Sequence, residues 1–532
     1  MSSSIKPPSQ HGIKLAVNII STDFGQLVAK VCECLLRRGN LTKAQISKFS
    51  EVPHDKVTKC LWVLIQHNCV QAFALEQQGG GRDTTVVVTQ YMALFNNIIQ
   101  RLRFAKFLLE VSKELDKEAQ GILGGLLQHG RLTLPQILDR AMETSDKGND
   151  VSRETYNESF ITLLRNRFVE RCPAAEPFIP LPTDEETKQS RPKARKVFAR
   201  REVTLEERAL AAAIPMDGER FSISNEHDVN SDEDKMDGNV PSAKVGEKRT
   251  QDSLEKSAEL DLLGPKGEPI WRVNFEEFIN RLRKKACVEY ARTVYDNTAG
   301  VILTSMLKRT KSTDNKVSMS LDSIFEEVVK SEEGSALNSE QVRCSLEQLH
   351  FCSEEDDVFT INLKDIIEKT RLEEVESLIL KRYGHDAFRI FRSLSSGRAL
   401  HTDQVSEKTL TDKKDTPQIL YKLWQDGFLH MEKISSGGGL KPTDYLYWSI
   451  KMDKIWPKVL DELHHAALNL SLRCVHEIEK NHEVNNMSKG DGKVLSQEAD
   501  RRIRRRQQVY IALNSSLMQL DDAIMFFTDF LV

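Results

Sequence analysis

The hydrophobic and polar positions of this chain recur in a pattern that repeats along its length. Residues 39–46 (GNLTKAQI) and 130–137 (GRLTLPQI) carry Gly, Leu, Thr, Gln and Ile at equivalent positions. Residues 397–405 (GRALHTDQV) repeat the pattern with one extra residue after the glycine, and 319–324 form a weaker copy. Such internal similarity indicates one supersecondary unit used several times.

A second pattern follows each copy downstream. It reads LWVLIQHNCV at 61–70, FITLLRNRFV at 160–169 and LYKLWQDGFL at 420–429, and it is shortened after 346–349. An apolar pair three residues apart is typical of the buried stripe of a helix, and Asn or Gly ends that helix. The apolar residue after the break then begins a strand.

An amphipathic helix precedes each copy, and a hairpin with a Gly-rich tip follows the first and fourth copies, at 72–88 and 429–448. Three short helices followed by a hairpin make up the winged-helix fold, a helix-turn-helix with a β-wing. The alternative is a generic α-helical repeat array, against which the Gly-rich hairpins argue. We therefore predict a mainly α fold with small β-wings.

The predicted organisation has six parts. Four tandem winged-helix domains are expected at 13–97, 98–172, 269–366 and 367–450, the third being least clear because its wing is poorly marked. Residues 173–268 are polar and punctuated by proline, which predicts a charged, largely disordered linker. From residue 451 two apolar stripes of helical period flank Asn and Gly residues, which predicts an antiparallel helical hairpin (coiled coil) over 451–532.

Composition narrows the function classes. Lys and Arg number 75 against 79 Asp and Glu, a net charge of -4, so the protein is not a globally basic nucleic-acid binder. No apolar stretch approaches the ~18 residues of a membrane span, and residues 1–10 lack the core of a signal peptide. The nine cysteines include no Cys-x-x-Cys pair, which argues against a zinc ribbon and favours reduced thiols in the cytosol or nucleus.

Sequence motifs for catalysis are missing. The chain has no phosphate loop, no dinucleotide-binding glycine turn, no His-Glu-x-x-His motif and no nucleophile elbow. We therefore expect no catalytic residues, no cofactor and no bound metal, and a chain that is not an enzyme by itself.

DNA-reading winged helices place their third helix in the major groove, with basic side chains at phosphates. The DNA-contact candidates are basic residues assigned to the predicted third helices: Lys56, Lys59, Arg165, Arg167, Arg171, Lys413 and Lys414. Acidic neighbours accompany them, which favours protein docking over sequence-specific DNA reading. Contacts to phosphates without sequence preference stay open.

Two basic runs lie outside the predicted winged helices. The first run lies in the linker and comprises Arg191, Lys193, Arg195, Lys196, Arg200 and Arg201. It fits a nuclear localisation signal, a nucleic-acid contact or a solvated stretch with chance charges. The second run lies early in the second hairpin helix and comprises Arg501, Arg502, Arg504, Arg505 and Arg506. It fits a docking site for an acidic partner or a solvated face.

The strings VLIQHN at 63–68, FVERCP at 168–173 and IWRVNFEEF at 270–278, in this domain order, resemble a known family. The family is the third-largest, winged-helix subunit of eukaryotic RNA polymerase III, related to the large subunit of transcription factor IIE. The resemblance covers almost the whole chain except the linker.

The resemblance implies a non-catalytic polymerase subunit in the nucleus. Its expected partners are the clamp of the largest subunit, on which the hairpin would pack, and a smaller winged-helix subunit and an acidic-tailed subunit that complete a heterotrimer. The family supports promoter-specific initiation and DNA opening for transfer RNA, 5S ribosomal RNA and other small RNAs. Contact with DNA near the transcription bubble would be weak and without strong sequence preference.

Two other interpretations stay open. A free-standing winged-helix transcription regulator would dimerise and bind one DNA site tightly, whereas a winged-helix scaffold of another complex would have stable partners but no polymerase. The polymerase interpretation predicts that deleting 451–532 releases the protein from polymerase and leaves the winged helices folded.

Overall fold

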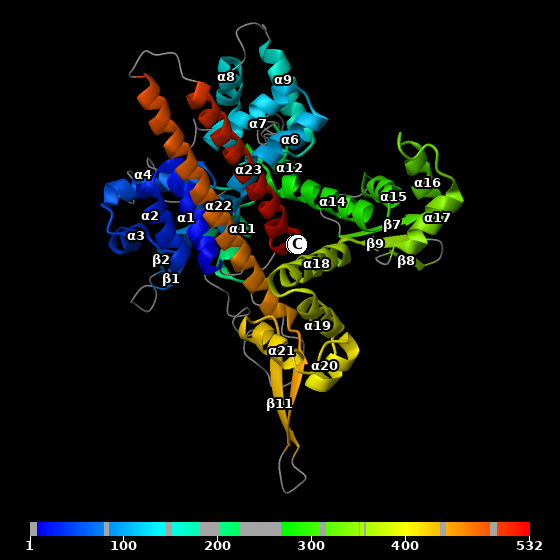
Figure 1. The fold of residues 1–532 in the computed structure, drawn as a ribbon. Coiled ribbons are helices and arrows are strands. Elements are labelled where there is room, and N and C mark those ends of the chain that lie inside the picture. Colours follow the sequence, from blue (N-terminus) through cyan, green and yellow to red (C-terminus); the bar gives the residue numbers. More distant parts are fainter. Residues whose placement is uncertain are drawn as a thin grey trace, which may run out of the picture. The chain divides into compact units, whose positions relative to one another are not determined.

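The computed structural model describes residues 8–78, 85–144, 152–180, 203–223, 268–308, 315–349, 352–355, 358–436, 443–489 and 497–531. The chain divides into two compact units, Ile13–Phe278 and Ile279–Val532, and Ser9–Gly12 are grouped with the second. The prediction of a mainly helical protein with small sheets is confirmed (Figure 1).

The sheets of the described residues share one strand order. Three of the four three-stranded sheets place their first strand beside their last strand, and the last strand also pairs with the middle one. Their orders are β3-β6-β4 (Leu132–Thr133, Ile270–Val273, Val169–Arg171), β7-β9-β8 (Lys316–Ser320, Val358–Asn362, Cys352–Glu355) and β10-β12-β11 (Leu400–His401, Thr443–Ser449, His430–Ser436). In the remaining sheet, β2-β1-β5 (Thr85–Ala93, Val70–Gln78, Phe178–Ile179), a single bridge from Leu41 to Tyr91 on β2 takes the place of the first strand. The repeated sequence pattern thus corresponds to a repeated topology.

The first part of unit Ile13–Phe278 contains four helices and a long hairpin. Its elements are α1 (Gln10–Phe24), α2 (Gln26–Arg38), α3 (Lys43–Ser50), α4 (His54–Gln66), β1 (Val70–Gln78) and β2 (Thr85–Ala93). A capping box between Thr42 and Gln45 begins α3, which satisfies backbone N–H groups at the helix start.

The second part repeats this arrangement, but its wing is assembled from distant segments. Its elements are α5 (Phe95–Gln100), η1 (Arg101–Arg103), α6 (Phe104–Glu114), α7 (Lys117–His129), β3 (Leu132–Thr133), α8 (Leu134–Thr144), α9 (Arg153–Arg165), β4 (Val169–Arg171) and β6 (Ile270–Val273). The sequence analysis placed β6 in the third domain, whereas it pairs with both β3 and β4. Trp271 on β6 is fully buried, edge-on to Phe160 at 5.3 Å, so this domain needs β6 to close its core.

The linker prediction also needs a correction, because two of its stretches fold onto the first sheet and beside the second. β5 (Phe178–Ile179) pairs in parallel with β1, and α11 (Leu205–Ala213) buries Ala209 against the cluster that contains Phe73. α12 (Asp217–Arg220) follows and contacts β4. The apolar residues of these stretches have a sheet to cover, which accounts for their order.

The second unit holds two further sheets. α14 (Phe275–Val294) leads into it, and the elements of its first sheet region are α15 (Asn297–Lys308), β7 (Lys316–Ser320), α16 (Leu321–Val329), α17 (Ser339–Gln348), β8 (Cys352–Glu355) and β9 (Val358–Asn362). After α18 (Leu363–Tyr383), those of the second are α19 (His385–Ser395), β10 (Leu400–His401), α20 (Thr402–Thr409), α21 (Thr416–Gln425), β11 (His430–Ser436) and β12 (Thr443–Ser449).

The chain continues in α22 (Met452–Lys489), α23 (Gln497–Phe527) and η4 (Asp529–Leu531). α22 and α23 pack along each other, and Arg506 on α23 donates to the carbonyl of Lys480 on α22 at 3.2 Å. The base of this hairpin, formed by the start of α22 and the end of α23, does not pack as a separate module. Its residues Ile455, Val459 and Phe527 share one hydrophobic core with α19, α21 and β12. The expectation that deleting 451–532 leaves every winged helix folded therefore conflicts with this packing.

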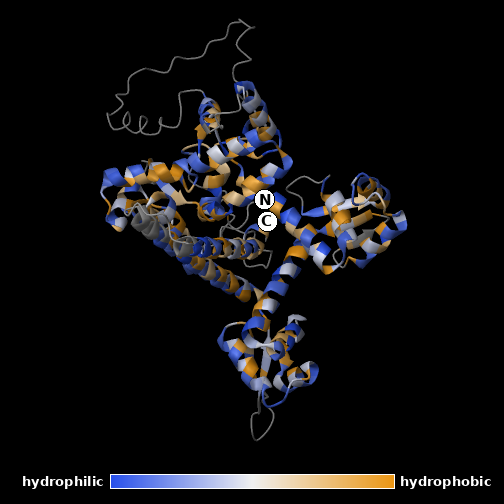
Figure 2. Ribbon diagram, turned by 45° about the horizontal axis from the view of Figure 1, so that its top comes forward, coloured by the Kyte–Doolittle hydropathy of each residue, from blue (hydrophilic) through white to orange (hydrophobic). Residues whose placement is uncertain are grey.

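In Figure 2 the helices carry both hydrophobic and hydrophilic residues along their length. None of the described helices is both long and apolar enough to cross a membrane.

Candidate nucleic-acid and partner interfaces

The exposed stripe of α4 carries two predicted DNA-contact residues. Val57, Cys60, Leu61 and Leu64 face the core, and this period leaves Lys56 and Lys59 exposed. Trp62 extends the same stripe and is 41% exposed. Sequence reasoning missed Trp62 because it lies in an apolar run that reads as core; its offset of three from Lys59 was the available signal.

The arginines at the end of α9 lie beside the linker. Arg165 and Arg167 are both exposed, and the guanidinium of Arg167 lies 5.1 Å from the ring of Phe221. Arg171 on β4 donates from Nε to the carbonyl of Ser222 at 2.9 Å. Arg167 and Arg171 thus contact Phe221 and Ser222, and Arg165 and Arg167 are both displayed to solvent.

A buried carboxylate organises this region. Glu170 is 2% exposed and accepts hydrogen bonds from Arg220 on α12 at 2.5 Å and from Arg272 on β6 at 2.8 Å. Burial alone would lower the pKa of Arg220, but Glu170 raises it above its ordinary value. The linker residue Arg220 thus fastens α12 to the second sheet, an ion pair that no local sequence pattern indicated.

Lys413 and Lys414 lie in the turn before α21 and not on that helix, which begins at Thr416. This differs from the expected third-helix position, since Pro417 at the helix start fixes the beginning of α21. Both lysines are exposed, and the Lys413 ammonium lies 3.5 Å from Glu407. Part of the Lys413 charge is therefore already compensated.

The arginine run of α23 is displayed to solvent along one side of the helix. Arg501, Arg504 and Arg505 are exposed, and Arg506 is half-buried against α22. The side chain of Arg502, like the linker run 191–201, lies outside the described residues.

An apolar continuation follows this basic run. Ile511 is 66% exposed and Met518 is 37% exposed, and both follow Arg504 at intervals of seven residues. Seven residues are two helical turns, so these three side chains share one face. Positive charge followed by apolar residues suits an acidic, amphipathic partner segment.

The described part of the chain contains no group of three or more His, Cys, Asp or Glu side chains that would hold a metal ion. The displayed features are basic and aromatic surfaces.

Comparison with protein families gives three successive matches. Residues 14–75 match the model described as RNA polymerase III subunit RPC82 helix-turn-helix domain, and residues 158–375 match RNA polymerase III subunit RPC82. Residues 375–449 match POLR3C, C-terminal winged-helix domain.

Curated relatives agree with these models. DNA-directed RNA polymerase III subunit RPC3 of Bos taurus is 24% identical, covering 89% of this chain and 86% of the relative. The Homo sapiens protein of the same name is 24% identical over 89% of this chain and 85% of its own. The Dictyostelium discoideum subunit rpc3 is 20% identical over 88% and 92%. The chain belongs to the family of winged-helix subunits of RNA polymerase III known as RPC3.

Proposed function

We propose that this chain is a non-catalytic subunit of nuclear RNA polymerase III that supports promoter-specific initiation and DNA opening in the synthesis of transfer RNA, 5S ribosomal RNA and other small RNAs. The observation that carries the proposal is the similarity to subunit RPC3 of Bos taurus along 89% of the chain. Four sheets of one strand order, in a chain whose described residues display basic and aromatic surfaces, suit a docking scaffold.

The proposed architecture is four tandem winged-helix domains followed by a helical hairpin. The second domain is extended by β6, and the base of the hairpin is shared with the fourth. This geometry makes the outer length of the α22–α23 pair available for a partner, while its base serves the fold.

The proposed partners are the clamp of the largest subunit, a smaller winged-helix subunit and an acidic-tailed subunit. The exposed arginines of α23, together with Ile511 and Met518 further along the helix, form the surface that would contact the clamp of the largest subunit. The stripe of Lys56, Lys59 and Trp62 provides a surface for nucleic-acid phosphates without reading base edges.

Affinity purification of the tagged chain from nuclear extract, with mass spectrometry of stoichiometric partners, tests the assignment. We expect the large polymerase III subunits and two small companions. A preparation without polymerase would favour a free-standing regulator or another scaffold, and tight binding to one DNA site would then distinguish the regulator.

The docking face is tested by changing Arg501, Arg504 and Arg505 together to glutamate. We expect loss of polymerase subunits from the preparation. The matched control changes three exposed lysines outside the hairpin, Lys330, Lys364 and Lys381, to glutamate and should retain polymerase. Equal recovery of polymerase subunits with both variants would show that α23 is not part of the interface.

A further inference from the structure

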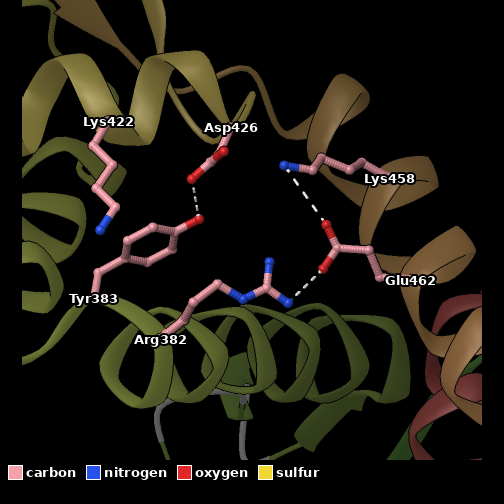
Figure 3. Close-up of a pocket in the computed structure, with 6 residues that line it drawn as sticks. All are labelled: Arg382, Tyr383, Lys422, Asp426, Lys458 and Glu462. Carbon is pink, nitrogen blue, oxygen red and sulfur yellow. Dashed lines mark hydrogen bonds and ion pairs between the residues drawn. The ribbon is translucent and has the colours of Figure 1, made fainter.

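A pocket of about 500 Å³ lies where the ends of α18 and α21 meet the first turns of α22 (Figure 3). Its lining consists of three cations and two carboxylates with one phenol: Arg382, Lys422, Lys458, Asp426, Glu462 and Tyr383. Gly384 and Gly427 donate their N–H groups to carbonyls at the ends of α18 and α21, at 3.1 and 2.9 Å. These carbonyls are therefore already engaged and do not give the pocket a free acceptor.

The carboxylates of the pocket are occupied by its own donors. Glu462 accepts from Arg382 at 2.8 Å and lies 3.7 Å from the Lys458 ammonium. Asp426 accepts from the Tyr383 hydroxyl at 2.6 Å, and burial together with Asp426 raises the pKa of Tyr383 to about 12, so that this hydroxyl keeps its proton. Three positive charges thus face two negative charges that are already bonded.

The positive excess is concentrated on the two lysines. The Lys422 ammonium lies 5.5 Å from the Tyr383 ring, and the Lys458 ammonium lies 3.9 Å from the Phe428 ring. Burial lowers the pKa of Lys458 although Glu462 and Asp426 oppose the shift. The Lys458 ammonium is partly desolvated and shares the single carboxylate of Glu462 with Arg382, so an added anion stabilises it.

We propose that this pocket is a binding site for a phosphate group, held by Lys422, Lys458 and Arg382. In Figure 3 the side chains of Lys458 and Arg382 extend into the space between the helices, and that of Lys422 extends down from α21 beside Tyr383. A compact oxyanion with several acceptor oxygens bonds to more than one of these donors at once.

The lining also defines the ligand class. Charged and polar side chains line the pocket, so it does not suit a large apolar cofactor. The Arg382 and Lys458 side chains are 45% and 30% exposed, so a ligand exchanges with solvent. Free phosphate and the phosphate of a modified serine share the required chemistry. The inference rests on the pocket alone and is independent of polymerase assembly.

Inorganic phosphate is the probe, titrated into the full chain at constant ionic strength and followed by calorimetry and by phosphorus NMR line width. We expect saturable binding of one phosphate in the millimolar range, near −4 kcal/mol. Lys422→Gln, which leaves the core contact of Lys458 in place, should weaken binding at least ~10-fold, about 1.4 kcal/mol. Lys458→Gln should do the same.

The control is Lys454→Gln, an exposed lysine one turn earlier on α22, which should bind as the parent does. A phosphoserine peptide that binds at least ~10-fold tighter than inorganic phosphate would identify a modified protein as the source, and equal or weaker binding would identify free phosphate. No saturable binding up to ~20 mM, or equal loss in all three variants, would overturn the proposal.

Discussion

At the scale of single residues, Glu170 is a buried carboxylate that pairs with two arginines. Its carboxylate joins Arg220 and Arg272, whose side chains are 16% and 17% exposed. Glu170→Ala should lower the free energy of unfolding by ~3–5 kcal/mol, because it removes the buried partner of two poorly hydrated guanidinium groups and leaves Arg220 with the exposed Glu276. Urea denaturation of the full chain measures this loss.

Glu276 gives the matched comparison for Glu170. It also pairs with Arg220, at 3.2 Å, but its side chain is 61% exposed. Glu276→Ala should cost less than ~1 kcal/mol, because water replaces an exposed partner. If both variants lost the same amount, the buried carboxylate would not be the anchor of α12.

His67 predicts a pH dependence. Burial, with Arg101 and His129 nearby, lowers its pKa from 6.5 to about 4 in the folded chain. Between these two values the unfolded chain binds the additional proton, so stability falls as the pH drops from 6.5 to 4, by at most ~3 kcal/mol. In His67→Gln the free energy of unfolding should change less over this interval; an unchanged slope would exclude His67 as the cause.

Single residues also show what the sequence did and did not disclose. The polar break after each third helix was predicted, and its residues Asn68, Arg167 and Gly427 adopt positive φ of 57°, 60° and 75°. Asn and Gly favour this conformation, whereas Arg does not, so the break at Arg167 had no residue-type signal of its own. The contact between Arg167 and Phe221 joins residues 54 positions apart, beyond the reach of any local pattern.

At the scale of elements, the packing of α18 against α22 and α23 depends on a buried arginine. Arg371 is 5% exposed, its guanidinium lies 4.2 Å from the Trp456 ring and 5.2 Å from the Phe527 ring, and burial lowers its pKa to about 10. None of the described residues accepts a hydrogen bond from its Nε. Arg371→Met should therefore be neutral or raise the melting temperature.

Arg371→Ala provides the contrast. It removes the same charge and also the volume between the two rings, so we expect a loss of ~2–4 kcal/mol. Thermal melting of both variants separates charge from packing. A large loss in the methionine variant would mean that the cation itself secures the contact between these helices.

The shared core predicts different results for two deletions in the hairpin. Removing 451–532 takes Ile455, Val459 and Phe527 from the core around Phe391 and Trp448, so protease sites should open within 385–449. Removing only 470–516 and joining the ends with a short Gly-Ser link retains these residues and should keep 385–449 protected. Limited proteolysis tests both; equal protection would show that the fourth domain folds without the hairpin base.

The elements that the sequence predicted are those formed by neighbouring segments. The first and fourth wings, β1–β2 and β11–β12, were located from alternating residues around a Gly-rich tip. β8 and β9 were missed because their connection is acidic and lacks glycine. β6 was assigned to the wrong domain because its partner β4 ends 99 residues earlier, and strand pairing over such a distance leaves no periodic signal.

At the scale of the whole molecule, a net charge of -4 limits DNA binding to local surfaces. Lys56→Gln with Lys59→Gln should weaken binding equally for all sequences and reduce the slope of log affinity against log salt by ~1.8, that is ~0.9 for each phosphate that a lysine no longer neutralises. Lys413→Gln should change the slope less, because Glu407 already compensates that charge. Fluorescence anisotropy with two unrelated duplexes over a salt series measures both. A change for one duplex alone would indicate base reading by α4 and would support a sequence-specific regulator over a polymerase subunit.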